Sequence, residues 1–181
     1  MATIHFKGDL TEPATGKLFL TKDNRVISYY GVEHGEDIKR INTKPDSKIQ
    51  TLNDFFKILL SAWSKDTAYP TCQEDPTYDE EKNPSYGQCA ITAKLACELF
   101  GGTIHKVRMK DGTSHYFNKI NGKYFDLTCD QFVQQLIEVK YEPNEEVPKD
   151  YLGKNGNTKK RYELLAQRIS ELDRSGDASS P

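Results

Sequence analysis

Two turn dipeptides, Asp111-Gly112 and Asn121-Gly122, constrain the fold more than any other feature, because they divide residues 104–127 into three short segments. Both dipeptides favour the two-residue turns that join neighbouring antiparallel strands. The chain therefore predicts a three-stranded antiparallel meander. Its strands are expected at Ile104–Met109, Ser114–Ile120 and Lys123–Leu127.

Helical patterns precede the meander. Residues 51–64 repeat apolar side chains at the spacing of one helical face, and Thr51 with Asp54 approximates a capping box. Residues 87–100 predict a second helix, which Gly101-Gly102 would end in a left-handed cap. Helices combined with an antiparallel meander indicate an α+β domain.

The chain divides into three parts. Residues 1–48 are rich in turn signals, and we expect a small β-rich element there. Residues 49–174 hold the meander and the helices, including a third helix near 158–172. Residues 175–181 are small and polar, and we expect them to be disordered. The short β-like runs of the first part lie at Ile4–Lys7, Lys17–Thr21 and Val26–Val32.

Two segments of the central part predict loops. Residues 66–84 contain Pro70, Pro76 and Pro84, which forbid a continuous helix, and residues 141–156 are loop-like as well. The acidic stretch 73–81 leads towards Cys89. It either forms one wall of a cleft or is simply a solvated charge run.

Composition excludes several classes of function. The 25 basic and 27 acidic residues are interspersed, so no basic face for nucleic acid is expected. No apolar run approaches the ~20 residues of a membrane span, and the start of the chain lacks a signal-peptide pattern. We therefore expect a cytoplasmic location. Free thiols are expected, because no C-x-x-C pair supports a zinc or other metal site. The four cysteines are Cys72, Cys89, Cys97 and Cys129.

Cys89 is the candidate nucleophile because it lies at the start of the helix predicted over 87–100. The unpaired N–H groups and the dipole of a helix N-terminus favour a thiolate. Gly87 would allow a tight turn and a close approach of substrate. Gln88 could supply its side-chain amide or its backbone N–H to a developing oxyanion. The alternative is that Cys89 behaves as a small buried apolar residue. We expect Cys97, in the interior of the same helix, to be such a residue.

The second turn selects the partners of Cys89. With Asn121-Gly122 as a two-residue turn, Ile120 faces Lys123, and alternation puts His115 and Asp126 on one face as diagonal neighbours. His115 would accept the thiol proton, and Asp126 would orient and stabilise the imidazole. The alternative is that the two residues make only a structural hydrogen bond.

The first turn argues against two other candidates. With Asp111-Gly112 as a two-residue turn, His105 faces Asn118 on the side away from His115. His105 is then a poor base, and Asn118 points away from the triad. A slip of one residue in this register would reverse both assignments.

The motif Tyr86-Gly87-Gln88-Cys89 resembles the cysteine motif of transglutaminases, although Ala90 stands where those enzymes usually have tryptophan. The resemblance implies a Cys, His, Asp triad on a papain-like fold. It makes Tyr86, Gly87 and Gln88 the candidates for substrate and oxyanion contacts.

Residues 59–132 also resemble the YunG family of bacterial proteins, with several blocks in the same order. The chain departs from that pattern at Phe117 and Cys129, where the family usually has tryptophan and arginine nearby. The resemblance implies a papain-like α+β domain, with the cysteine helix packed on the meander, and no particular substrate. The matching blocks are Trp63–Thr67, Asn83–Ala93, Phe100–Gly102, Ser114–Asn118 and Asp126–Phe132.

The leading functional hypothesis is a cysteine hydrolase or acyltransferase that acts on an amide or thioester through Cys89, His115 and Asp126. Peptidase, deamidase, amidase and transglutaminase-like activities share this chemistry, and none needs a cofactor. A protein or peptide substrate is expected. The alternative is a catalytically silent papain-like binding module or effector, and the oligomeric state is not readable from the chain.

Overall fold

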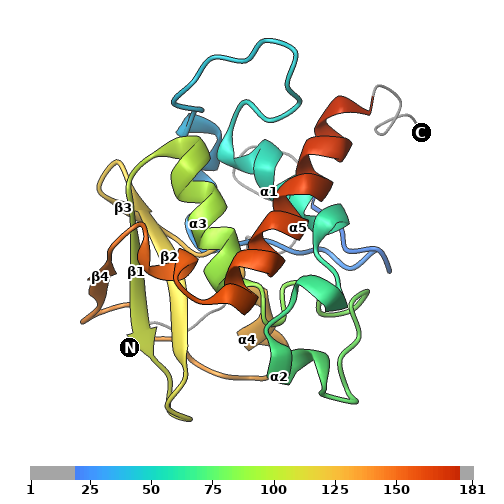
Figure 1. Ribbon diagram of the computed structural model, residues 1–181, viewed down its shortest axis with the longest axis vertical. Coiled ribbons are helices and arrows are strands. Elements are labelled where there is room, and N and C mark those ends of the chain that lie inside the picture. The colour runs from blue at the N-terminus through green and yellow to red at the C-terminus, as the bar shows by residue number, and fades with distance from the viewer. Residues whose placement is uncertain (1–18, 176–181) are drawn as a thin grey trace.

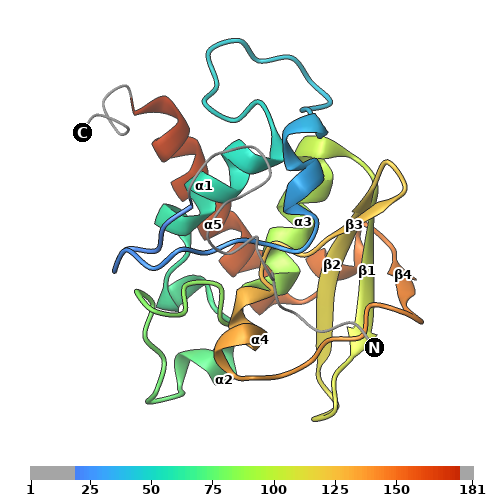
Figure 2. The ribbon, with the colours of Figure 1, turned by 180° about the vertical axis from the view of Figure 1, so that it is seen from behind.

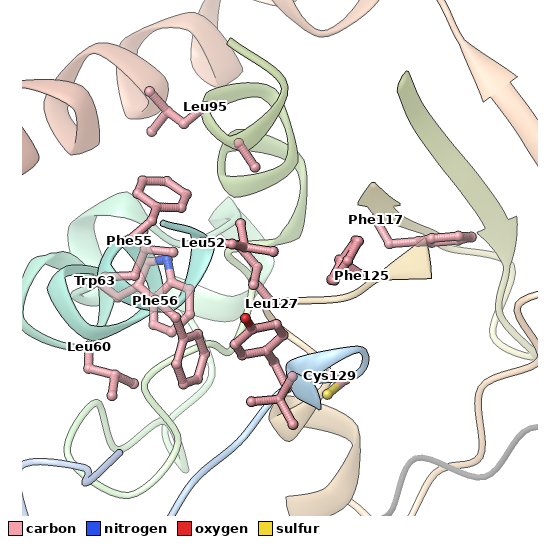
Figure 3. Close-up of a cluster of buried hydrophobic side chains, with 14 of the residues drawn as sticks. Leu52, Phe55, Phe56, Leu60, Trp63, Leu95, Phe117, Phe125, Leu127 and Cys129 are labelled. Atoms are coloured by element: carbon pink, nitrogen blue, oxygen red, sulfur yellow. The ribbon is translucent and has the colours of Figure 1, made fainter. Parts of the chain in front are cut away.

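The strongest helical pattern becomes α1 (Leu52–Ala62) in the computed structural model, which describes residues 19–175. The predicted capping box is confirmed: Thr51 Oγ1 accepts the N–H of Asp54, and the Asp54 carboxylate accepts the N–H of Thr51. The buried face of α1 forms the centre of the main core. Figure 3 shows Leu52, Phe55 and Phe56 of this face beside Trp63.

The two other long helices also follow the prediction. Helix α3 (Cys89–Phe100) begins two residues later than expected and is followed by the C-cap residue Gly101, whose φ is +84°. Helix α5 (Gly156–Arg174) extends the expected helix at both ends. The shorter helical turns are η1 (Val32–Asp37), η2 (Lys65–Thr67), α2 (Pro70–Gln73), α4 (Asp130–Gln134) and η3 (Tyr151–Gly153).

The sheet has four antiparallel strands in the order β3-β2-β1-β4. The predicted meander forms three of them, with β3 two residues shorter than expected at its C-terminal end. The fourth strand lies within residues 141–156, which the sequence predicted as loop. The strands are β1 (Thr103–Arg108), β2 (Ser114–Ile120), β3 (Lys123–Phe125) and β4 (Glu145–Val147).

The two hairpins differ in how well the sequence predicted their register. Ile120 pairs with Lys123 in the second hairpin, which confirms that register. The register of the first hairpin was wrong by one residue, because His105 pairs with Phe117 and not with Asn118. The cause is a three-residue connection. The Met109 N–H donates to the Thr113 carbonyl over 2.8 Å, the Gly112 N–H donates to the Met109 carbonyl over 2.9 Å, and Gly112 has a φ of +89°. A residue in this conformation commonly closes a three-residue hairpin loop.

The segment before α1 packs into the same core. Within residues 19–48 the structure contains isolated β-bridges and η1, and no extended strand. The bridges join Leu20 to Val26, Tyr30 to Asp126, and Lys39 to Thr51. The expected β run at Ile4–Lys7, the first two residues of the run at Lys17–Thr21 and most of the expected disordered tail lie outside the described residues.

The arrangement of these elements brings three chain segments to one end of the molecule. Figure 1 and Figure 2 show α3 between the sheet on one side and α1 and α5 on the other. The N-terminal end of α3, the start of β2 and the N-terminal end of α5 gather at the same end. Among residues 19–175, no helix has both the length and the apolar character needed to cross a membrane.

Candidate active site

Cys89 is the first residue of α3 and is partly exposed. The turn before it depends on Gly87, whose φ is +75°. The N–H of Gly87 donates to Gln131 Oε1 over 3.2 Å, and its carbonyl accepts the N–H of Tyr69 over 2.9 Å. A Cβ atom at Gly87 would lie 2.9 Å from Cys72 Sγ and from the Tyr69 nitrogen. Only glycine fits this turn without strain, so it fixes where the helix begins.

Gln88 holds the same turn from inside the protein. Its side chain is fully buried; Nε2 donates to the Ser64 carbonyl over 2.9 Å, and Oε1 accepts from the Thr67 hydroxyl over 2.8 Å. Its backbone N–H donates to the Ser85 carbonyl. The expectation that Gln88 supplies an oxyanion donor is therefore not supported, because its polar groups already have partners within the protein.

Tyr86 likewise faces the preceding loop. Its hydroxyl donates to Asp75 Oδ2 over 2.9 Å, and its ring lies 5.3 Å from that of Tyr78. Burial and the neighbouring carboxylate raise the pKa of Tyr86 above its ordinary value. Tyr86 thus ties the acidic stretch 73–81 to the turn before Cys89.

His115 and Asp126 form a buried pair. His115 Nε2 lies 2.6 Å from Asp126 Oδ2, and each side chain is 1% exposed. The imidazole ring meets Phe132 edge to face at 4.5 Å, and lies 6.3 Å from the ring of Phe117. This packing leaves the ring little freedom to rotate away from Asp126.

Asp126 is held by further donors. The Tyr141 hydroxyl donates to Oδ2 over 2.7 Å, and the Thr128 N–H donates to Oδ1 over 3.2 Å. Two backbone hydrogen bonds join Asp126 to Tyr30, at 3.0 and 3.3 Å. The carboxylate therefore keeps a fixed orientation towards His115.

The second ring nitrogen of His115 is the unusual atom of the site. Nδ1 is buried and has no hydrogen bond of ordinary geometry to any residue in 19–175. Cys89 nevertheless interacts with this side chain closely enough to affect its protonation. Burial lowers the pKa of His115, but the Asp126 carboxylate and, to a smaller extent, Cys89 raise it, to about 10. Because Nε2 faces Asp126, Nδ1 is the nitrogen available to the thiol.

The other cysteines have different surroundings. Cys97 and Cys129 are buried, and burial raises the pKa of both thiols. Burial also raises the pKa of Cys72, which packs against Gly87. No group of three His, Cys, Asp or Glu side chains in the described part of the chain could hold a metal ion.

His105 and Asn118 are occupied elsewhere. The corrected register puts His105 on the same face as His115, contrary to the prediction. Its ring nitrogens lie 2.7 Å from Thr103 Oγ1 and 2.8 Å from Asn144 Oδ1, so both have partners. The Asn118 amide donates to the Ala93 carbonyl of α3 over 2.9 Å. Of the other two histidines, His34 lies in η1 and His5 lies outside the described residues.

Two residues at the site were not identified from the sequence. Tyr141 comes from a segment predicted as loop, and Arg161 comes from the first part of α5. Arg161 Nη1 donates to the carbonyl of Thr67, the residue whose hydroxyl bonds Gln88. No local pattern marks either residue, because their partners are distant in the chain.

Comparison with known proteins identifies a family whose shared region includes Cys89, His115 and Asp126. The family model described as YunG protein matches residues 51–173. The chain is 38% identical over 87 residues to the protein named "Uncharacterized protein YunG" of Bacillus subtilis (strain 168). That alignment covers 48% of this chain and 67% of the relative. No solved structure gives a significant match. The family match spans α1, α3, the sheet and nearly all of α5, and the chain therefore belongs to the YunG family.

Proposed function

We propose that the protein is a cysteine hydrolase or acyltransferase that acts on an amide or thioester through Cys89, His115 and Asp126. The observation that carries the proposal is the His115 ring, which bonds Asp126 through Nε2 and keeps a buried, unpaired Nδ1 on the side available to Cys89. A buried polar atom without a partner is uncommon and calls for an explanation. Proton transfer with a thiol supplies one.

Before substrate binds, the Cys89 thiol has given its proton to His115 Nδ1, so the proposed reaction starts from a thiolate–imidazolium pair, in agreement with the raised pKa of His115. The thiolate attacks the carbonyl carbon, and the electron pair of the C=O bond moves to oxygen. Backbone N–H groups in the first turn of α3 lack intrahelical acceptors, so they are the proposed oxyanion donors. When the tetrahedral intermediate collapses, His115 returns the proton to the leaving nitrogen or sulfur. Water or a second nucleophile then releases the acyl group from Cys89.

The organisation of the elements supports a papain-like reading of this site. A helix that begins at Cys89 packs beside an antiparallel sheet, and the second strand of that sheet carries His115. Tyr69 and Tyr151 are exposed, at 52% and 44%. Tyr151 interacts with Tyr116, which in turn interacts electrostatically with Cys89. Exposed aromatic rings suit contacts with a protein or peptide substrate.

The first test measures alkylation of each thiol by iodoacetamide at about pH 6, with peptide mapping. We expect Cys89 to react faster than Cys97, which serves as the internal control because it sits in the same helix. His115→Ala should remove that advantage. Equal rates for the two thiols would refute an activated Cys89.

The second test asks whether an acyl-enzyme forms. Wild type and Cys89→Ala are mixed with a small activated thioester, and the intact mass is followed with time. An acyl adduct on Cys89, discharged faster in the presence of amines, supports an acyltransferase; discharge by water alone supports a hydrolase. Absence of any adduct on wild type favours the alternative of a silent binding module.

A further inference from the structure

Arg161 is a buried cation that the proposed reaction does not yet use. The residue is 4% exposed, although it lies near the start of α5. Nε donates to Asn157 Oδ1 over 2.7 Å, Nη1 donates to the Thr67 carbonyl over 3.1 Å, and Nη2 donates to Thr158 Oγ1 over 3.3 Å. Arginine has five N–H donors, so two remain without an acceptor among residues 19–175.

None of the three acceptors of Arg161 carries a charge. Within the described part of the chain, no carboxylate forms an ion pair with this guanidinium, although Arg25 and Arg168 each have one. Burial of an unpaired charge is costly, and buried charges are normally paired. The anion that balances this guanidinium therefore has to come from a group other than a carboxylate of residues 19–175.

Two neighbours of Arg161, Thr67 and Tyr69, also contact the turn that precedes Cys89. Thr67 accepts from Arg161 through its carbonyl and contacts Gln88 through its hydroxyl. Tyr69 lies under the guanidinium, with its ring centroid 5.6 Å from Cζ, and its N–H donates to the Gly87 carbonyl. The two residues that precede Cys89 are thus bonded to the two residues that surround Arg161. Figures 1 and 2 agree in placing the N-terminal ends of α3 and α5 together.

We propose that Arg161 is a positioning residue that stabilises the Cys89 thiolate, which forms when the thiol proton moves to His115 Nδ1. The inference rests on the proposed function. The thiolate then interacts with two cations, the imidazolium of His115 and the guanidinium of Arg161. Low exposure of Arg161 favours this internal anion over a carboxylate of an incoming substrate. The electrostatics agree in direction: burial lowers the pKa of Arg161, and Cys89 is the largest opposing influence.

The test compares the pH profile of iodoacetamide labelling at Cys89 in wild type, Arg161→Gln, Arg161→Lys and the control Arg168→Gln. Arg168 lies on the same helix, but its guanidinium pairs with Asp66 at 2.6 Å. In Arg161→Gln we expect labelling at about pH 6 to slow about tenfold, which corresponds to a profile moved up by about one pH unit, with the rate at high pH unchanged. Arg161→Lys should restore most of the rate, and Arg168→Gln should behave as wild type.

Two results would overturn the role of Arg161 while leaving the proposed function intact. One is an unchanged pH profile in Arg161→Gln, with Cys89 still outpacing Cys97. The other is slower acylation by a carboxylate-bearing thioester only, relative to a neutral one, which would assign the guanidinium to substrate binding. Failure of the proposed function itself shows differently, as equal labelling of Cys89 and Cys97 in wild type.

A measurement on the unmutated protein tests the proposal even if Arg161→Gln fails to fold. The side-chain Nε resonance of Arg161 is followed by NMR before and after alkylation of Cys89, which replaces the thiolate with a neutral thioether. We expect this resonance to shift and that of Arg168 to stay in place. An unmoved Arg161 resonance would contradict the proposal.

Discussion

Tyr141 donates its hydroxyl proton to Oδ2 of Asp126, the same oxygen that lies 2.6 Å from His115 Nε2. The Tyr141 ring is fixed by Tyr30, stacked at 4.5 Å, and by Phe117, edge-on at 5.0 Å. One carboxylate oxygen thus interacts with two side chains, one from β2 and one from the segment between α4 and β4. The segment predicted as a loop supplies part of the support for the proposed triad.

Tyr141→Phe should destabilise the protein by about 1–2 kcal/mol, because it removes one donor from a buried carboxylate and keeps the ring packing. Urea unfolding at neutral pH measures the change. Tyr124→Phe is the matched control, since the Tyr124 hydroxyl bonds Glu142 and Asn144 and does not contact Asp126. Equal losses in the two variants would contradict a special role for the bond to Asp126.

The stability of the protein should depend on pH through His115. Its pKa is about 10 in the folded protein, above the ordinary value of 6.5. A raised folded-state pKa contributes stability that is fully present below the unfolded pKa and is lost as pH rises through the folded one. The urea midpoint should therefore fall from about pH 6.5 to about pH 10.

His115→Gln should flatten this pH dependence, whereas His34→Gln should leave it unchanged. His34 is the control because its side chain is 42% exposed and lies in η1, away from Asp126. A wild-type midpoint that stays constant across this range would show that His115 is not held in its charged form.

Gly87→Ala should destabilise the protein and slow alkylation of Cys89, because the new Cβ would meet Cys72 and the Tyr69 backbone at 2.9 Å. A positive φ alone costs about 1 kcal/mol, and overpacking adds about 1–3 kcal/mol. Gly112→Ala is the control: φ is +89°, but nothing lies within 4 Å of the added atom. The extra loss of unfolding free energy in Gly87→Ala over that in Gly112→Ala measures the cost of the steric contact. Equal losses in the two variants would argue against such a contact.

Gln88→Ala should lower the free energy of unfolding by about 2–3 kcal/mol, since Ser64 and Thr67 lose buried hydrogen-bond partners. Chemical denaturation is the measurement, with alkylation of Cys89 followed in the same samples. If stability is unchanged and acyl-enzyme formation is lost, the amide contacts substrate after all.

Local signals predicted the elements that carry the proposed triad. Apolar periodicity and the capping box located α1, and the Asn121-Gly122 turn fixed the register that relates His115 to Asp126. The first hairpin was misread because Asp111-Gly112 belongs to a three-residue connection, which a dipeptide alone does not distinguish from a two-residue turn. His105 is excluded by its bonds to Thr103 and Asn144, and not by the face on which it lies.

The missed residues depend on contacts between distant segments. Arg161 and Thr67 are 94 positions apart, and their bond exists only because α5 packs beside η2. Strand β4 was missed because three residues of Glu145–Val147 carry no alternating pattern, and the strand forms by pairing with β1. Such pairings follow from the assembled fold and leave no local trace in the chain.

The backbone bridge between Tyr30 and Asp126 affects where this protein can be shortened. The family match begins at residue 51, yet two hydrogen bonds that anchor the acid of the proposed triad come from a residue 21 positions earlier. A fragment trimmed to residues 51–173 would also lose the Tyr30 ring that stacks on Tyr141. Expression designs and activity assays should therefore keep the preceding segment, because the contacts that hold Asp126 and Tyr141 extend beyond the shared family region.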